Sequence, residues 1–228
     1  MKKKEVIVVA GGVGKRMESS VPKQFLRLKD EIILIKTIRL FYELDRSAHI
    51  VVTLPAKEIE KWNNICKTEN FNIPHTIAKG GETRFHSVRN ALSLIEGDSL
   101  VAIHDGVRPL VSKGTILRAF EKADRKGSAI PVTDIYESIR YIKGNETRNV
   151  NREYYKMVQT PQVFDSQILS KAYETNYMPE FTDDASVVEK TGNKIHVVKG
   201  NPENIKITTK KDLAIAEALI PFIENQVD

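Results

Sequence analysis

The sequence predicts an α/β protein with a mostly parallel, twisted sheet and helices on both of its faces. Three observations support this prediction. Short apolar runs without polar alternation indicate strands that are buried on both faces. Segments with helical periodicity lie between them, and the two kinds of segment alternate through the first 130 residues. Strands that alternate with helices form a parallel sheet covered on both sides.

Four apolar runs are expected to be strands, at residues 6–10, 49–54, 100–104 and 129–132. Helices are expected at residues 35–44, 57–69, 84–95 and 115–126, where apolar residues recur at three- and four-residue spacing. Ligands of such sheets bind outside the carboxyl ends of the strands. The loops that follow the strands are therefore the places to look for chemistry.

The alternation ends after residue 132. Residues 135–150 form two alternating stretches around the turn at 143–146, which predicts a hairpin. A lone hairpin is marginally stable in water, so this one must rest on something else. Three helices are expected afterwards, at 165–173, 183–190 and 210–223, and the last begins with a capping-box-like spacing of Thr209 and Asp212.

Composition limits the class of protein. The 228 residues carry 35 basic and 30 acidic side chains, for a formal charge of +5, and 41% of residues are hydrophobic. Such a chain is an ordinary globular protein of one domain, spanning residues 1–228, and neither a collagen, a coiled coil nor a disordered chain. No apolar run approaches the roughly 18 residues of a membrane span. Lys2 to Lys4 are followed at once by Glu5 and a short apolar run, which predicts a strand and not a signal peptide.

A single cysteine, Cys66, cannot form an internal disulfide, which favours a cytoplasmic location. The basic charge leaves open a nucleic-acid-binding domain as a remote alternative. Basic and acidic residues nevertheless interleave, as in residues 58–61, and do not gather in one strip along the sequence. We therefore expect neither nucleic acid nor a membrane as a partner.

A glycine-rich loop, residues 10–17, directly follows the first predicted strand. Its glycines let backbone amides approach an anion closely. A P-loop is excluded by Val9 and Arg16, and a dinucleotide fingerprint by Met17. The cations nearby are Lys15, Arg16 and Lys23, a density that suits a triphosphate. The alternative is a tight turn with solvated charges.

Two further motifs lie at the ends of predicted elements, one at the end of a strand and one at the start of a helix. Residues 104–109 end a strand, where Asp105 could hold magnesium and Arg108 could pair with a phosphate or anchor Asp105, while His104 is more often packed than catalytic. Residues 80–84 with Ser87 place backbone groups and a hydroxyl at a helix N-terminus. This loop can contact the edge of a base, or it can simply begin a helix.

Two late motifs carry polar residues. Thr182 and Asp183 precede a helix, where a residue of either type is more often simply an N-cap than part of a site. Residues 204–208 are expected to form a strand, in which Lys206 points away from its neighbours Ile205 and Ile207.

Motifs of hydrolytic or acyl-transfer enzymes are missing from the sequence: it has no Gly-x-Ser-x-Gly elbow, no pair of nucleophilic Cys with His and no zinc-type spacing. Nucleotidyl transfer to a phosphate needs none of these, because a phosphate monoester is already an anionic nucleophile at pH 7. Cations, a metal and positioning are enough.

Six motifs in order resemble the 2-C-methyl-D-erythritol 4-phosphate cytidylyltransferase family over nearly the whole chain. They are residues 10–17 with 22–24, 80–84 with 87–88, 104–109, 159–162, 182–185 and 204–208. The resemblance implies a Rossmann-like fold and an enzyme of the non-mevalonate isoprenoid pathway. It would join CTP and methylerythritol phosphate, a polyol phosphate, into CDP-methylerythritol and pyrophosphate, with Mg²⁺ as cofactor.

The resemblance also implies roles for residues. Arg16 and Lys23 would contact the triphosphate, residues 10–11, 81–82 and 87 would surround cytosine, and Lys206 with Thr182 would serve the sugar phosphate. The hairpin at 135–150 resembles a dimerisation arm of a homodimer, and Arg152 matches an arginine that reaches the partner's site. The full expectation is Arg16, Lys23, Arg152 and Lys206 as catalytic; Ala10, Gly11, Gly12, Gly14, Gly81, Glu82, Arg84, Ser87 and Asp105 for the nucleotide; Arg108, Thr182 and Glu203 for the acceptor; and Asp105 for the metal.

Two positions depart from the family pattern. Ile135 follows Asp134 where the family commonly has threonine, and Glu203 replaces the usual aspartate before Asn204. The related ribitol 5-phosphate cytidylyltransferases share the fold and the CTP half of the site. Residues 182–186 and 104–106 are more similar to the methylerythritol enzymes, which we therefore favour.

Overall fold

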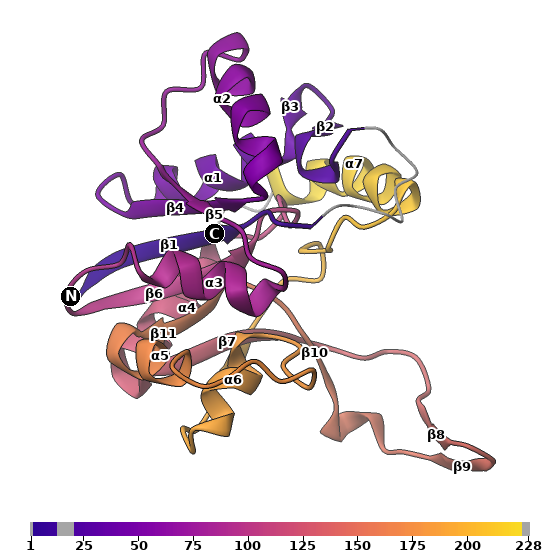
Figure 1. The fold of residues 1–228 in the computed structure, drawn as a ribbon. Helices are drawn as coiled ribbons and strands as arrows, with labels where there is room; N and C mark the ends of the chain where they lie inside the picture. Colours follow the sequence, from indigo (N-terminus) through magenta and orange to yellow (C-terminus); the bar gives the residue numbers. More distant parts are fainter. Residues whose placement is uncertain (1, 13–20, 225–228) are drawn as a thin grey trace.

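A mixed, mostly parallel sheet runs through the body of the molecule (Figure 1). The computed structural model describes residues 2–12 and 21–224. The strand order is β10-β7-β11-β6-β1-β4-β5, and β12 pairs with β7. The strands are β1 Lys3–Val9, β4 His49–Leu54, β5 Thr76–Lys79, β6 Ser99–Asp105, β7 Ser128–Asp134, β10 Lys156–Val158, β11 Gln162–Asp165 and β12 Val197–Lys199. A separate short pair consists of β2 Arg27–Leu28 and β3 Glu31–Ile32.

Helices cover both faces of this sheet, as the sequence predicts. Along β1, Val6 and Val8 pack with helices α1, α2 and α4, while Ile7 packs with α3, α5 and α6. The alternation of side chains along a strand produces these two layers. The helices are α1 Ile33–Leu44, α2 Ile59–Thr68, α3 Arg84–Leu92, α4 Lys113–Lys126, α5 Ser166–Ala172, α6 Asp184–Lys190 and α7 Lys210–Glu224.

All four expected strands are present, but the strand expected at residues 204–208 is not. That segment is irregular: the backbone N–H of Ile207 donates to the carbonyl of Val107 over 3.0 Å, and Arg108 Nη1 donates to the carbonyl of Asn204 over 2.7 Å. Isolated bonds to a loop and a side chain replace a strand ladder. The alternating burial of Ile207 and Lys206 persists without a strand.

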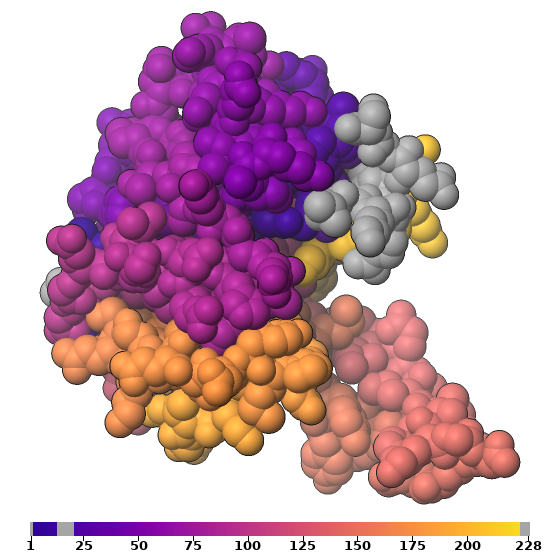
Figure 2. All heavy atoms as spheres, viewed as in Figure 1, coloured from indigo at the N-terminus to yellow at the C-terminus, as the bar shows by residue number. Residues whose placement is uncertain are grey.

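The predicted hairpin is formed by β8 Arg140–Lys143 and β9 Glu146–Asn149. It stands away from the body together with the short helix η4, Arg152–Tyr154 (Figures 1 and 2). Large apolar side chains of this arm face solvent, with Ile142 71% and Tyr154 83% exposed. Within the described residues, no helix is both long and apolar enough to cross a membrane.

Candidate functional site

Two joined cavities lie at the carboxyl end of β1 and β6. The first has a volume of about 320 Å³ and the second about 250 Å³. Both are lined by Arg84, Asp105 and Lys206, which therefore mark the junction. The first cavity also has residues 9–12, 23–24, 81–83, 87 and 107 in its wall, and the second has residues 108, 158–160, 162 and 182–183.

The glycine-rich loop forms one wall of the first cavity. Ala10, Gly11 and Gly12 line it. The buried side chain of Gln24 fixes this wall, since its Nε2 donates to the carbonyl of Ala10 over 3.0 Å. A Cβ added at Gly12 would lie 3.6 Å from Cε of Lys23, which shows how closely that lysine approaches the loop. Two predicted residues, Gly14 and Arg16, lie outside the described residues.

The turn before α3 forms the opposite wall. Thr83 caps the helix, and the Oγ of Ser87 donates to the carbonyl of Thr83 over 3.0 Å and accepts from the N–H of Gly81 over 3.0 Å. Only glycine fits at position 81, because a Cβ there would lie 2.3 Å from Cβ of His86. A hydroxyl has two acceptor positions, so Ser87 can accept one more hydrogen bond from a ligand. Glu82 lines the same cavity.

Asp105 is the acidic centre of the junction. Its carboxylate is 3.0 Å from Nζ of Lys206, 3.2 Å from Nε of Arg108 and 3.5 Å from Nε of Arg84. Burial alone would raise the pKa of Asp105, but the charges of Arg84, Lys206 and Arg108 hold it well below its usual range. The carboxylate therefore stays ionised and holds three cations around it.

His104 is packed, in agreement with the sequence analysis. It is fully buried, its Nε2 lies 3.1 Å from the carbonyl of Arg108, and its Nδ1 lies 3.0 Å from Oγ1 of Thr160. Because the carbonyl requires a donor, Nε2 carries the proton and Nδ1 accepts. Burial lowers the pKa of His104 to about 4. The neutral ring supports the strand end beside Asp105.

The second cavity brings Arg108 and Thr182 together with three residues for which the sequence analysis gave no role. Gln159, Thr160 and Gln162 line it, on the segment that leads into β11. They belong to residues 159–162, one of the six motifs that resemble the family, and this resemblance was the one signal in the sequence that could have indicated a role for them. The unpredicted strand β11 pairs with β6 and so brings this segment beside the site.

Two expected site residues, Glu203 for the acceptor and Arg152 as a catalytic residue, lie elsewhere. Glu203 lines neither cavity, and its carboxylate accepts from the side-chain amide of Asn201 over 3.2 Å. Arg152 lies on the arm, where its guanidinium donates to the carbonyl of Tyr136, and it lines neither cavity of its own chain. Any contact of Arg152 with a site must therefore involve another chain or a movement of the arm.

A metal ion would find one carboxylate at the junction. The described residues contain no group of three or more His, Cys, Asp or Glu that could hold an ion. Magnesium commonly binds one or two carboxylates together with waters and substrate phosphates, so the single carboxylate of Asp105 fits it.

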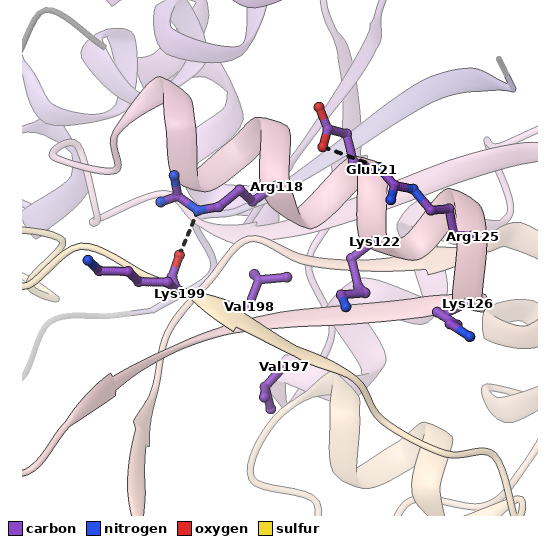
Figure 3. Close-up of a pocket in the computed structure, with 8 residues that line it drawn as sticks. All are labelled: Arg118, Glu121, Lys122, Arg125, Lys126, Val197, Val198 and Lys199. Carbon is purple, nitrogen blue, oxygen red and sulfur yellow. Dashed lines mark hydrogen bonds and ion pairs between the residues drawn. The ribbon is translucent and has the colours of Figure 1, made fainter.

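A third cavity, of about 380 Å³, lies between α4 and β12 (Figure 3). Its wall contains five cations and one acid, Glu121. It shares no residue with the joined cavities and lies beside a helix flank, not at the strand ends where α/β sheets bind ligands. The joined cavities are therefore the candidate functional site.

Comparison with known proteins shows which family the chain resembles. The family model for 2-C-methyl-D-erythritol 4-phosphate cytidylyltransferase matches residues 5–221. A relative of that name from Phocaeicola vulgatus is 49% identical over 95% of this chain and 99% of its own length. One from Bacteroides fragilis is 48% identical over 94% of this chain and 98% of its own length.

Solved structures give the same answer. The 4-diphosphocytidyl-2C-methyl-D-erythritol synthase of Anaerococcus prevotii has a TM-score of 0.83 at 26% identity and covers 96% of each chain. The 2-C-methyl-D-erythritol 4-phosphate cytidylyltransferase of Thermus thermophilus has a TM-score of 0.77 at 30% identity, over 97% of this chain and 100% of that one. These likenesses confirm the predicted Rossmann-like fold.

Proposed function

Since the chain belongs to the 2-C-methyl-D-erythritol 4-phosphate cytidylyltransferase family, we propose that its two joined cavities hold CTP and the acceptor side by side. The protein is a nucleotidyltransferase that transfers CMP from CTP to 2-C-methyl-D-erythritol 4-phosphate in isoprenoid synthesis. The observation that carries the assignment of the cavities is their junction. Arg84, Asp105 and Lys206 line both, so charged groups lie where the two phosphates would meet.

The reaction forms one bond and breaks another. An oxygen of the acceptor phosphate attacks the α-phosphorus of CTP, and the bond from that phosphorus to the oxygen bridging to the β-phosphate breaks, releasing pyrophosphate. Because the attacking phosphate is already ionised, no residue needs to remove a proton. The work of the protein is to bring two anions together and to stabilise the charge that develops between them.

Lys23, Lys206 and Arg108 are proposed to supply that charge. Lys23 lies beside the glycine loop of the first cavity, Arg108 lines the second, and Lys206 lies between them. Arg16 follows the same loop in sequence, outside the described residues. Magnesium, when bound, adds positive charge beside the triphosphate, and Asp105 is the carboxylate that would hold it.

The first cavity is proposed to recognise cytosine. Ser87 donates its own proton to Thr83, so its oxygen is available to accept from the amino group of a base. Uracil lacks that donor. Glu82 and the backbone of Gly81 line the same wall.

The arm is proposed to form a homodimer. Tyr136, Ile142, Tyr154 and Met157 each expose more than half of their surface, and a hairpin of this size is marginally stable without support. A second chain packed on the arm would bury these residues, and it would allow Arg152 to reach the partner's acceptor cavity. The single domain, the cytoplasmic location and the lack of a nucleic-acid partner stay predictions.

Pyrophosphate release tests the function directly. Each of four nucleoside triphosphates is combined with methylerythritol phosphate or with ribitol 5-phosphate. We expect rapid release only with CTP and methylerythritol phosphate. Faster turnover of ribitol 5-phosphate would contradict the assignment of the acceptor, and equal use of all four nucleotides would contradict that of the first cavity.

A further inference from the structure

One guanidinium connects the two cavities. Arg84 begins α3 and lines both of them. Its Nη1 and Nη2 donate to the two carboxylate oxygens of Asp184 over 2.7 and 2.6 Å, and its Nε lies 3.5 Å from Oδ1 of Asp105. The planar group is therefore fixed along one edge while its remaining nitrogen faces the junction.

Asp184 is itself held from behind. It is fully buried, and its Oδ1 also accepts from the hydroxyl of Tyr173 over 2.6 Å. The ring of Tyr173 stacks on Phe85, the residue after Arg84, with centroids 4.8 Å apart. Burial raises the pKa of Tyr173 well above its usual value, and the charge of Asp184 raises it further, so the hydroxyl stays a donor.

Tyr173 and Asp184 do not line the joined cavities, but residues next to Asp184 in the chain do. Asp184 is the first residue of α6 and directly follows residues 182–183, which line the second cavity. Gln162 fastens the same turn: its Nε2 donates to Oδ2 of Asp183 over 2.8 Å, and its Oε1 accepts from the N–H of Ala185 over 2.9 Å. Asp184 thus joins the acceptor turn to the nucleotide turn through Arg84.

Stability alone is a weak reason for such an ion pair. Desolvation offsets much of the attraction in a buried pair, and apolar residues of similar volume are often as stable. An apolar pair could not, however, hold a guanidinium in one orientation over the carboxylate of Asp105. The arrangement has a directional effect at the place where the two substrates would meet.

We propose that Tyr173 and Asp184 are positioning residues for the transfer step. They fix the guanidinium of Arg84, and through it the carboxylate of Asp105, without touching either substrate. This inference rests on the proposed function, because it concerns the junction between the CTP and acceptor cavities.

The test is Tyr173→Phe, which removes one oxygen and keeps the ring on Phe85. We expect kcat to fall about tenfold, in line with the loss of one hydrogen bond to a charged group. Both KM values should change less than about twofold, because an effect on the transition state lowers kcat and kcat/KM equally. The assay is pyrophosphate release from CTP and methylerythritol phosphate, with thermal unfolding measured in parallel.

Tyr177→Phe is the matched control. Tyr177 also lies against Phe85, with centroids 5.9 Å apart, but the hydroxyl that donates to Asp184 is that of Tyr173. Its variant should keep the kcat of the unmodified enzyme. A Tyr173→Phe variant with a lowered melting temperature and unchanged kcat would show a purely structural role and overturn the proposal.

Arg84→Lys is the second variant, and it decides the question if Tyr173→Phe does not fold. Lysine keeps the charge but cannot bind Asp184 with two parallel hydrogen bonds. We expect a fall in kcat of more than tenfold, and full activity would overturn the proposal. If the unmodified enzyme itself released no pyrophosphate, the proposed function would have failed instead.

Discussion

Lys206→Ala separates catalysis from stability, because the structure predicts different magnitudes for the two. The ammonium of Lys206 lies 3.0 Å from the carboxylate of Asp105, but its side chain is 41% exposed. Ion pairs at such exposure contribute at most about 1 kcal/mol. Asp105 also keeps Arg84 and Arg108 in the variant. We therefore expect the melting temperature to fall by less than about 4 °C.

Catalysis should respond far more strongly to the same change. Lys206 lines both cavities, so its charge acts where the acceptor phosphate would attack the α-phosphorus. Removing one preorganised charge donor commonly lowers kcat about 100- to 1000-fold. Steady-state pyrophosphate release at saturating CTP and methylerythritol phosphate measures this loss, and thermal unfolding measures the stability.

Lys199→Ala is the control for the loss of a lysine charge. Lys199 lines the third cavity, between α4 and β12, and lines neither of the joined cavities (Figure 3). Its variant should keep normal turnover. If Lys206→Ala stayed within a fewfold of the unmodified enzyme, or lost activity only because it unfolded, the role of Lys206 in transfer would be refuted.

Three further predictions follow from the site. CTP should be used at least tenfold better than UTP, because O4 of uracil would be buried against the oxygen of Ser87 without a donor, at a cost of about 1–3 kcal/mol. Ser87→Ala should reduce this preference, while Ser93→Ala at the other end of α3 should not. Equal use of UTP by the unmodified enzyme would contradict the role of Ser87. Mixing Arg152→Ala chains with Lys23→Ala chains should restore about a quarter of normal active sites if Arg152 acts in the partner's site. Mass spectrometry first confirms that the two kinds of chain have exchanged. Activity no higher than the mean of the two variants would then mean that Arg152 does not act in the partner's site. The free energy of unfolding should fall as the pH drops from about 6.5 to 4, because His104 becomes protonated in the unfolded chain while the buried ring, with its pKa lowered to about 4, stays neutral. The loss approaches about 3 kcal/mol. A His104→Gln variant with the same pH profile would show that another group is responsible.

The sequence alone predicted the elements whose patterns are local. β1 and β6 are continuous apolar runs, and the loops after them do line the first cavity. The capping pattern at Thr209 and Asp212 is also confirmed, since Asp212 accepts from the N–H of Thr209 over 2.8 Å and its own N–H donates to Thr209. Local propensity and burial agree in these elements.

The elements that the sequence analysis missed or assigned wrongly depend on tertiary pairing. β11 has only four residues, and it is recognisable as a strand because it fits between β6 and β7. The segment around Lys206 shows the opposite error, since alternating burial resembled a strand where the backbone is irregular. The contact of Arg84 with Asp184 joins positions a hundred residues apart, and nothing local in the sequence indicated it.

The carboxylate of Asp105 lies among three cations and holds them in place. Lys206, Arg108 and Arg84 lie within 3.5 Å of the carboxylate of Asp105. Because Arg84 is also paired with Asp184, three cations and two carboxylates leave an excess of one positive charge at the junction. Like charges held so close repel one another unless an anion lies between them. Asp105 keeps the cations oriented before any ligand arrives, and a bound triphosphate would neutralise the excess. Preorganised cations of this kind need no rearrangement when charge develops during transfer.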